Sequence, residues 1–139
     1  MTAPHVAITM GDPSGIGPEI IMKALGNKLV PEICRPLVIG DAERLRGAGA
    51  LVGSSLEVRS LAEPQEARFN PEEVECIDLR LVPPNHPFGT MSALSGDVAY
   101  RCIERAVKIV ESGHASAICT APLSKEALHA AGHKYPSKC

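Results

Sequence analysis

Short apolar runs alternate with stretches at helical spacing in the early part of the chain. Residues 6–10 and 36–40 are aliphatic runs of strand length. Between them, residues 19–29 place apolar side chains on one side of a predicted helix that Pro31 closes. The order strand, helix, strand predicts parallel strands joined by a right-handed crossover.

Weaker patterns occupy the middle of the chain. Asp41 is a favoured N-cap residue and predicts a helix over 42–46, after which the small and glycine-rich residues 47–53 predict a loop. Residues 56–61 predict a strand. The alternation of apolar and polar side chains over 74–82 predicts a further, half-exposed strand.

The clearest pattern lies in the last part of the chain. The proline-rich residues 83–90 predict an irregular loop, and an amphipathic helix is predicted between Ser92 and Gly113. Its apolar face is assigned to the core and consists of Val98, Ala99, Cys102, Ile103, Ala106, Val107, Ile109 and Val110. Residues 115–120 predict a buried strand, and Ser124 predicts the cap of a following helix.

Composition narrows the kind of core that these elements can build. Hydrophobic residues make up 45% of the chain and charged residues 22%, with two Tyr, two Phe and no Trp, so the core must be mostly aliphatic. The alternating elements then predict an α/β fold in three layers, a parallel or mixed sheet flanked by helices. No linker or repeat interrupts the chain, so residues 1–139 are assigned to one unit without an internal boundary.

Charge and hydropathy exclude several classes of partner. Fourteen Lys and Arg against sixteen Asp and Glu give a net charge of −2 without a basic block, so nucleic acid is not an expected partner. The sequence has no apolar run long enough to span a membrane and no signal peptide, which predicts a cytoplasmic protein. The five cysteines form no C-x-x-C pair, so neither a disulfide framework nor a zinc site is indicated.

A glycine-rich turn joins the first predicted strand to the first predicted helix. Gly11, Gly15 and Gly17 can take positive φ or admit a ligand close to the backbone, and Pro18 suits the first helical position. The amides at the start of the helix would then face the turn, an arrangement that binds anions. Alternatively the turn holds no ligand. Asp12 either orders the turn through an Asx-type hydrogen bond or accepts a hydrogen bond from a ribose.

Two common phosphate-binding motifs do not fit this turn. No Gly-Lys-Ser/Thr follows it, as a nucleotide triphosphatase would require, and the dinucleotide fingerprint lacks its third glycine. A ligand at this turn would therefore occupy a cofactor or substrate site of another kind, and the alternative of a turn without a ligand stays open.

A second junction between a strand and a helix offers further candidates. Thr120, Ser124 and Lys125 could present a hydroxyl, a helix cap and a cation to a phosphate or carboxylate, because parallel sheets bind ligands where their strands end. The alternative is a plain helix cap followed by a solvated lysine. His129 and His133 have the spacing of helical zinc ligands. Since a glycine separates them and no Glu follows the first, no metal site is predicted.

Three motifs of the chain resemble one known family. The strings GDPSGIGPEI (11–20), TAPLSKEAL (120–128) and AGHKYP (131–136) resemble the 4-hydroxythreonine-4-phosphate dehydrogenase family. The segment SGDVAYRC (95–102) looks more like the branch that acts on 4-phospho-D-threonate or 4-phospho-D-erythronate. The first string also resembles the GDGIGPE opening of isocitrate and isopropylmalate dehydrogenases, which implies a related fold.

The resemblance implies an activity for a longer protein. Its members oxidise a 4-phosphorylated four-carbon hydroxy acid with NAD(P) and a divalent metal (Zn, Mg or Co), and the product then loses carbon dioxide. 4-Hydroxy-L-threonine 4-phosphate, in pyridoxal phosphate biosynthesis, is the first expected substrate, and 4-phospho-D-threonate or D-erythronate is the alternative. The resemblance also implies a homodimer.

The same resemblance implies that this chain is an incomplete, N-terminal part. The family continues after its Tyr-Pro with Gly-His-Thr-Glu, whose His and Thr bind substrate, whereas here Ser137, Lys138 and Cys139 follow Pro136. The metal-binding histidines of the family and the lysine, asparagine and arginine of its substrate pocket lie farther on. We therefore expect no turnover by this chain alone. The competing hypothesis is a non-catalytic domain that binds a phosphorylated metabolite.

Overall fold

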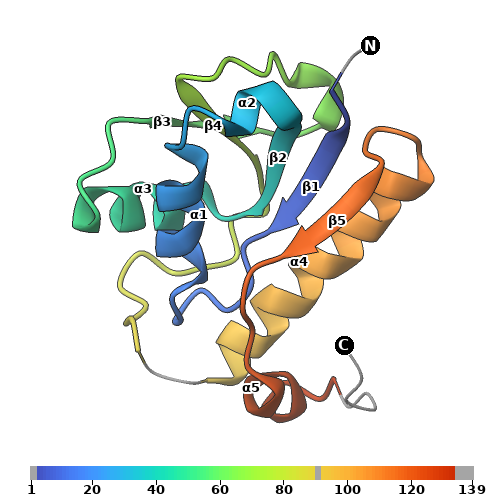
Figure 1. Cartoon of the computed structure of the whole chain (residues 1–139). Coiled ribbons are helices and arrows are strands. Elements are labelled where there is room, and N and C mark those ends of the chain that lie inside the picture. Colours follow the sequence, from blue (N-terminus) through green and yellow to red (C-terminus); the bar gives the residue numbers. More distant parts are fainter. Residues whose placement is uncertain (1–2, 90–91, 134–139) are drawn as a thin grey trace.

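The computed structural model describes residues 3–89 and 92–133. A five-stranded sheet forms its centre, with every neighbouring pair parallel and the strands in the order β3-β4-β2-β1-β5 (Figure 1). The strands are β1 (His5–Thr9), β2 (Arg35–Gly40), β3 (Glu57–Leu61), β4 (Glu73–Asp78) and β5 (Ala117–Thr120). The α-helices are α1 (Gly17–Leu25), α2 (Val30–Ile33), α3 (Ala42–Leu51), α4 (Ala93–Glu111) and α5 (Lys125–Ala130), and a 3-10 turn spans Pro64–Glu66.

The helices cover both faces of the sheet. Helices α1 and α3 lie together on one face, whereas α4 crosses the other face along β1, β2 and β5 (Figure 1). The predicted α/β class, with a parallel sheet flanked by helices, is therefore confirmed. From β1 the chain moves through α1 to β2, and it later returns through α4 to place β5 on the opposite side of β1. The direction of winding thus reverses between β1 and β5.

Aliphatic side chains fill the space between the sheet and its helices. The central strand β2 buries Leu37, Val38 and Ile39 almost completely. Helix α4 contributes the predicted Val98, Ala99, Cys102, Ala106 and Ile109. Val107, however, is 39% exposed, so the buried face of α4 is narrower than the sequence predicted.

The predicted helix bounds need correction in two places. The helix predicted over 19–29 begins at Gly17 and ends at Leu25, and Pro31 lies inside the short α2 rather than closing α1. A proline is tolerated there because first-turn amides have no partner within the helix. The helix predicted over 42–46 continues to Leu51, through residues predicted as a loop. Gly49 lets α3 approach Met22 of α1, so packing outweighs the low helix propensity of glycine.

For two strands, the solvent exposure predicted from the sequence was also wrong. The strand predicted over 74–82 ends at Asp78, and its four inner residues are buried because β4 lies between β3 and β2. Its polar position Glu75 does not face solvent but pairs with Arg59 at 2.7 Å. The strand predicted as buried over 115–120 is exposed along β5, since β5 lies at the edge of the described sheet.

Part of the sequence predictions lies outside the described residues. This holds for Thr90 at the end of the predicted loop and for the 134–139 segment, which contains the end of the third motif and its departure from the family pattern. Within the described ranges, we find no helix with the length and apolar character needed to cross a membrane.

Candidate functional site

The glycine-rich turn (residues 11–17) follows β1. Its three glycines differ in whether the backbone or the packing at that position requires glycine. Gly11 has φ +75°, and a Cβ there would overlap the carbonyl oxygen of Pro122. Gly17 has no positive φ, but its Cβ would overlap the carbonyl oxygen of Met10. Gly15 also lacks positive φ, and its Cβ would lie an ordinary 3.5 Å from the carbonyl oxygen of Asp12. Positive φ is therefore found at Gly11 alone among the three.

Asp12 shapes the turn through its own backbone neighbours. The amide of Ser14 donates to Asp12 Oδ1 at 2.8 Å, and the amide of Gly15 donates to the carbonyl oxygen of Asp12 at 3.0 Å. This is the Asx-type turn that the sequence offered as one of two alternatives. Asp12 as a whole is 7% exposed, so little of the residue faces a ligand.

The start of α1 leaves backbone donors beside this turn. Its N-cap is Ile16, which supplies no side-chain hydrogen bond, and Pro18 occupies the second helical position rather than the predicted first. By contrast, α3, α4 and α5 are capped by the side chains of Asp41, Ser92 and Ser124. The uncapped amides and the helix dipole together favour an anion at the α1 end.

The second predicted segment lies directly against the first. Thr9 and Thr120 are register partners in β1 and β5. Beyond them the amide of Ala121 donates to the carbonyl oxygen of Thr9 at 3.0 Å, and the amide of Asp12 donates to that of Pro122 at 3.2 Å. The structure thus brings the two predicted segments together at the carboxyl ends of adjacent strands, although they are far apart in the sequence.

The three candidates of the second segment have different surroundings. Ser124 is the N-cap of α5, because its hydroxyl accepts from the amide of Ala127 at 3.1 Å. Thr120 and Lys125 are both exposed at the same end of the sheet. A hydroxyl and a flexible ammonium are therefore accessible there, whereas the Ser124 hydroxyl already serves the helix.

His133 lies against side chains of α4. Its Nε2 lies 3.0 Å from Asp97 Oδ1, and its ring stacks on Tyr100 with centroids 3.8 Å apart. The hydrogen bond from His133, with a further one from Arg101, lowers the pKa of Asp97. Residues 3–89 and 92–133 contain no group of three potential His, Cys, Asp or Glu ligands.

Sequence reasoning missed a cluster of hydroxyls around His86. His86 Nε2 lies 2.7 Å from the Ser14 hydroxyl and 3.0 Å from that of Ser95, and the two hydroxyls also contact each other. Burial and the charge of Arg44 lower the pKa of His86, while Asp12 raises it. Ser14 is only 3% exposed, and its hydroxyl is engaged within this cluster. No periodic pattern marks 83–89, so only the lone histidine could have drawn attention to it.

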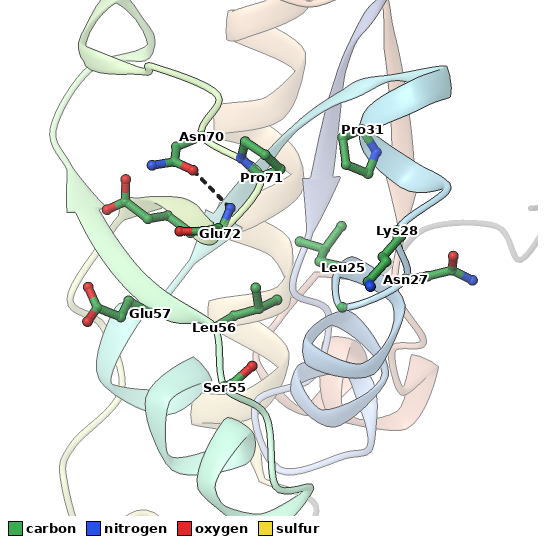
Figure 2. Close-up of a pocket in the computed structure, with 12 residues that line it drawn as sticks. Leu25, Asn27, Lys28, Pro31, Ser55, Leu56, Glu57, Asn70, Pro71 and Glu72 are labelled. Carbon is green, nitrogen blue, oxygen red and sulfur yellow. Dashed lines mark hydrogen bonds between the residues drawn. The ribbon is translucent and has the colours of Figure 1, made fainter.

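Two hollows lie away from the predicted site residues. One of about 680 Å³ opens at the amino ends of β3 and β4, where Glu57, Glu72, Lys28 and Asn70 surround it (Figure 2). Another of about 520 Å³ lies beside α3 and includes Phe88. Because parallel sheets bind ligands at the carboxyl ends of their strands, the first hollow is not assigned to the site.

Comparison with known proteins gives consistent matches along the chain. The family model described as "Pyridoxal phosphate biosynthetic protein PdxA" matches residues 32–139. A D-threonate 4-phosphate dehydrogenase from Cupriavidus necator is 56% identical over 133 residues, which are 96% of this chain and 40% of that protein. A 4-hydroxythreonine-4-phosphate dehydrogenase from Trichlorobacter lovleyi is 44% identical over 135 residues, again 96% and 40%.

A solved structure agrees with these sequence matches. The crystal structure of a 4-hydroxythreonine-4-phosphate dehydrogenase from Burkholderia phymatum superposes with a TM-score of 0.95 at 51% identity. The match covers 98% of this chain and 41% of that one. The chain therefore spans well under half the length of the proteins it matches.

Proposed function

The chain belongs to the PdxA family, and we propose that it forms the N-terminal part of a dehydrogenase that oxidises a 4-phosphorylated four-carbon hydroxy acid. Relatives named as dehydrogenases of such acids match 96% of the chain but only 40% of their own length. The proposed reaction is therefore that of a longer protein that carries these residues. We also propose that the longer protein is a cytoplasmic homodimer related in fold to isocitrate and isopropylmalate dehydrogenases.

D-Threonate 4-phosphate is the substrate that we favour. The relative with 56% identity is named for this substrate, whereas the relative named for 4-hydroxythreonine 4-phosphate is 44% identical. The two acids share a carboxylate, a reacting hydroxyl and a terminal phosphate. They differ at carbon 2, which carries a hydroxyl in the first and an amine in the second.

One observation of the structure carries the assignment of the site. The glycine-rich turn and the 120–125 segment meet where the winding direction of the sheet reverses, between β1 and β5. Open parallel sheets bind ligands at this position, outside the carboxyl ends of the strands. We assign the phosphate to the uncapped amides at the start of α1 and to the ammonium of Lys125, which both attract an anion.

The proposal also includes NAD(P) and a divalent metal, and neither has its full site among the described residues. A coenzyme would accept the hydride from the reacting carbon, and the resulting β-keto acid would lose carbon dioxide. Asp41, which follows β2, is 4% exposed and its two carboxylate oxygens accept from the amides of Arg44 and Val82, so it is not assigned to a ribose. The remaining ligands of both groups are therefore assigned to the rest of the longer protein.

A direct assay tests this proposal. We expect the full-length protein to reduce NAD or NADP with D-threonate 4-phosphate, with kcat/KM at least about tenfold above that for 4-hydroxy-L-threonine 4-phosphate, because a site built for a hydroxyl leaves polar groups unpaired against its analogue. A reversed preference would transfer the assignment to the other substrate. Tight binding of the acid without coenzyme reduction would contradict a dehydrogenase and favour a non-catalytic binding protein.

A further inference from the structure

The side chain of Arg44 joins two segments that lie far apart in the sequence. From α3, its Nε donates to the carbonyl oxygen of Pro13 at 2.7 Å, in the glycine-rich turn. Its Nη1 donates to the carbonyl oxygen of His86 at 2.6 Å, and its Nη2 donates to that of Pro87 at 3.1 Å. The guanidinium also lies 3.5 Å from the ring centroid of Phe88. One side chain thus binds the turn and the 83–89 loop at once.

The loop and the turn are also joined directly. The amide of Gly89 donates to the carbonyl oxygen of Ser14 at 2.6 Å. On the side-chain level, the Ser14 hydroxyl lies 2.7 Å from His86 Nε2 and contacts the hydroxyl of Ser95. These contacts fix Ser14 from the loop side while Arg44 fixes Pro13 from the side of α3.

The chemistry of Arg44 indicates a geometric role. The residue is 7% exposed, and burial lowers its pKa, whereas the carboxylates of Asp41 and Asp12 raise it. A buried guanidinium is costly to desolvate, and an apolar side chain of similar length would fill the same space without that cost. What an apolar side chain or a lysine cannot provide is a planar fork that satisfies three carbonyl oxygens of two segments in fixed directions.

We propose that Arg44 is a positioning residue of the candidate site, which holds the 83–89 loop against the glycine-rich turn and so fixes the turn for its ligand. This inference rests on the proposed function, because the ligand of the turn is the phosphorylated substrate of that reaction. Arg44 acts through its hydrogen bond to Pro13 and, by way of His86, through Ser14.

The test compares Arg44→Lys with Arg46→Gln in the full-length enzyme. Arg46 lies on the same helix and donates to Val58 rather than to the turn, so it is a matched control. For Arg44→Lys we expect KM for the phosphorylated substrate to rise at least about fivefold with kcat nearly unchanged. A misplaced turn weakens binding of the substrate, whereas a less stable fold lowers the number of active molecules. Arg46→Gln should leave both constants unchanged. A fall in kcat alone, with KM constant, would mean that Arg44 only stabilises the fold and would overturn the proposal.

A second variant covers the case in which Arg44→Lys does not fold. Arg44→Gln keeps one amide donor but loses the fork that binds Pro13, His86 and Pro87 together, and we expect the same rise in KM. An unchanged KM in this variant would also contradict the proposal.

An NMR titration of His86 separates this proposal from the proposed function. In Arg44→Met the pKa of His86 should rise relative to the wild-type protein, because the positive charge that lowers it is gone while Asp12 remains. An unchanged His86 pKa would show that the two side chains are not held together. A wild-type protein without dehydrogenase activity would refute the proposed function, while the titration would still test the contact.

Discussion

Replacing Gly11 by alanine is expected to lower the free energy of unfolding by about 3 kcal/mol or more and to remove binding at the candidate site. Gly11 has φ +75°, a backbone conformation that strains any residue with a side chain. The added Cβ would also overlap the carbonyl oxygen of Pro122 and lie 2.9 Å from that of Ala121. Both are backbone atoms of the segment after β5, so neither can rotate away. The substitution must therefore separate the two segments.

Gly15→Ala is the matched control for Gly11→Ala. Its Cβ would lie 3.5 Å from the Asp12 carbonyl oxygen, an ordinary contact, so we expect the free energy of unfolding to change by less than about 0.5 kcal/mol. Urea denaturation of both variants gives the comparison. Equal stability of the two would contradict the packing described for Gly11. If Gly15→Ala stays stable but loses activity, Gly15 is needed for close approach of the ligand.

Among the other glycines, Gly96 is the position where an added methyl group should lower the stability of the fold most. Gly96 lies in α4 where α5 crosses it, and a Cβ would overlap the carbonyl group of Ala127 and lie 2.7 Å from the amide of Leu128. Because these are backbone atoms of α5, the two helices must move apart. We expect a loss of about 2–3 kcal/mol in the free energy of unfolding, together with faster hydrogen exchange in α5.

Gly47→Ala makes the same change at an open position. Gly47 lies in α3 with no heavy atom within 4 Å of an added Cβ, so alanine should stabilise the chain by up to about 1 kcal/mol through its higher helix propensity. Thermal denaturation should therefore shift in opposite directions for the two variants. If both variants were destabilised by the same amount, the close packing of α4 against α5 would not be the reason that glycine is needed at position 96.

Local patterns were sufficient for the fold class but not for burial. Short apolar runs predicted the strands over 6–10 and 36–40, and alternation predicted the one over 74–82. The caps at Asp41 and Ser124 predicted the starts of two helices, because these features depend on neighbouring residues. Whether a strand is central or at an edge depends on its neighbours in the sheet. For this reason the polar position Glu75 looked solvent-facing although Arg59 pairs with it inside, and β5 looked buried although it lies at the edge.

The candidate site was predictable only where its residues come from local motifs. The sequence marked Gly11 and Lys125 because each belongs to a junction between a strand and a helix. It could not indicate Arg44 or His86, since their roles depend on contacts between α3, an irregular loop and the turn, which no periodicity records. A lone arginine in an amphipathic helix is ordinarily solvated, and only its burial distinguishes this one.

The most direct test of the proposed site is the KM of the full-length protein after Lys125→Gln. Lys125 is exposed, so its loss should not change the denaturation temperature, and Lys108→Gln on the exposed side of α4 is the matched control. Our account predicts that KM for the phosphorylated substrate rises at least about tenfold in Lys125→Gln and not in Lys108→Gln, equivalent to losing one charged hydrogen bond to the phosphate. Equal KM values for wild type and both variants would contradict a phosphate site at the ends of β1 and β5.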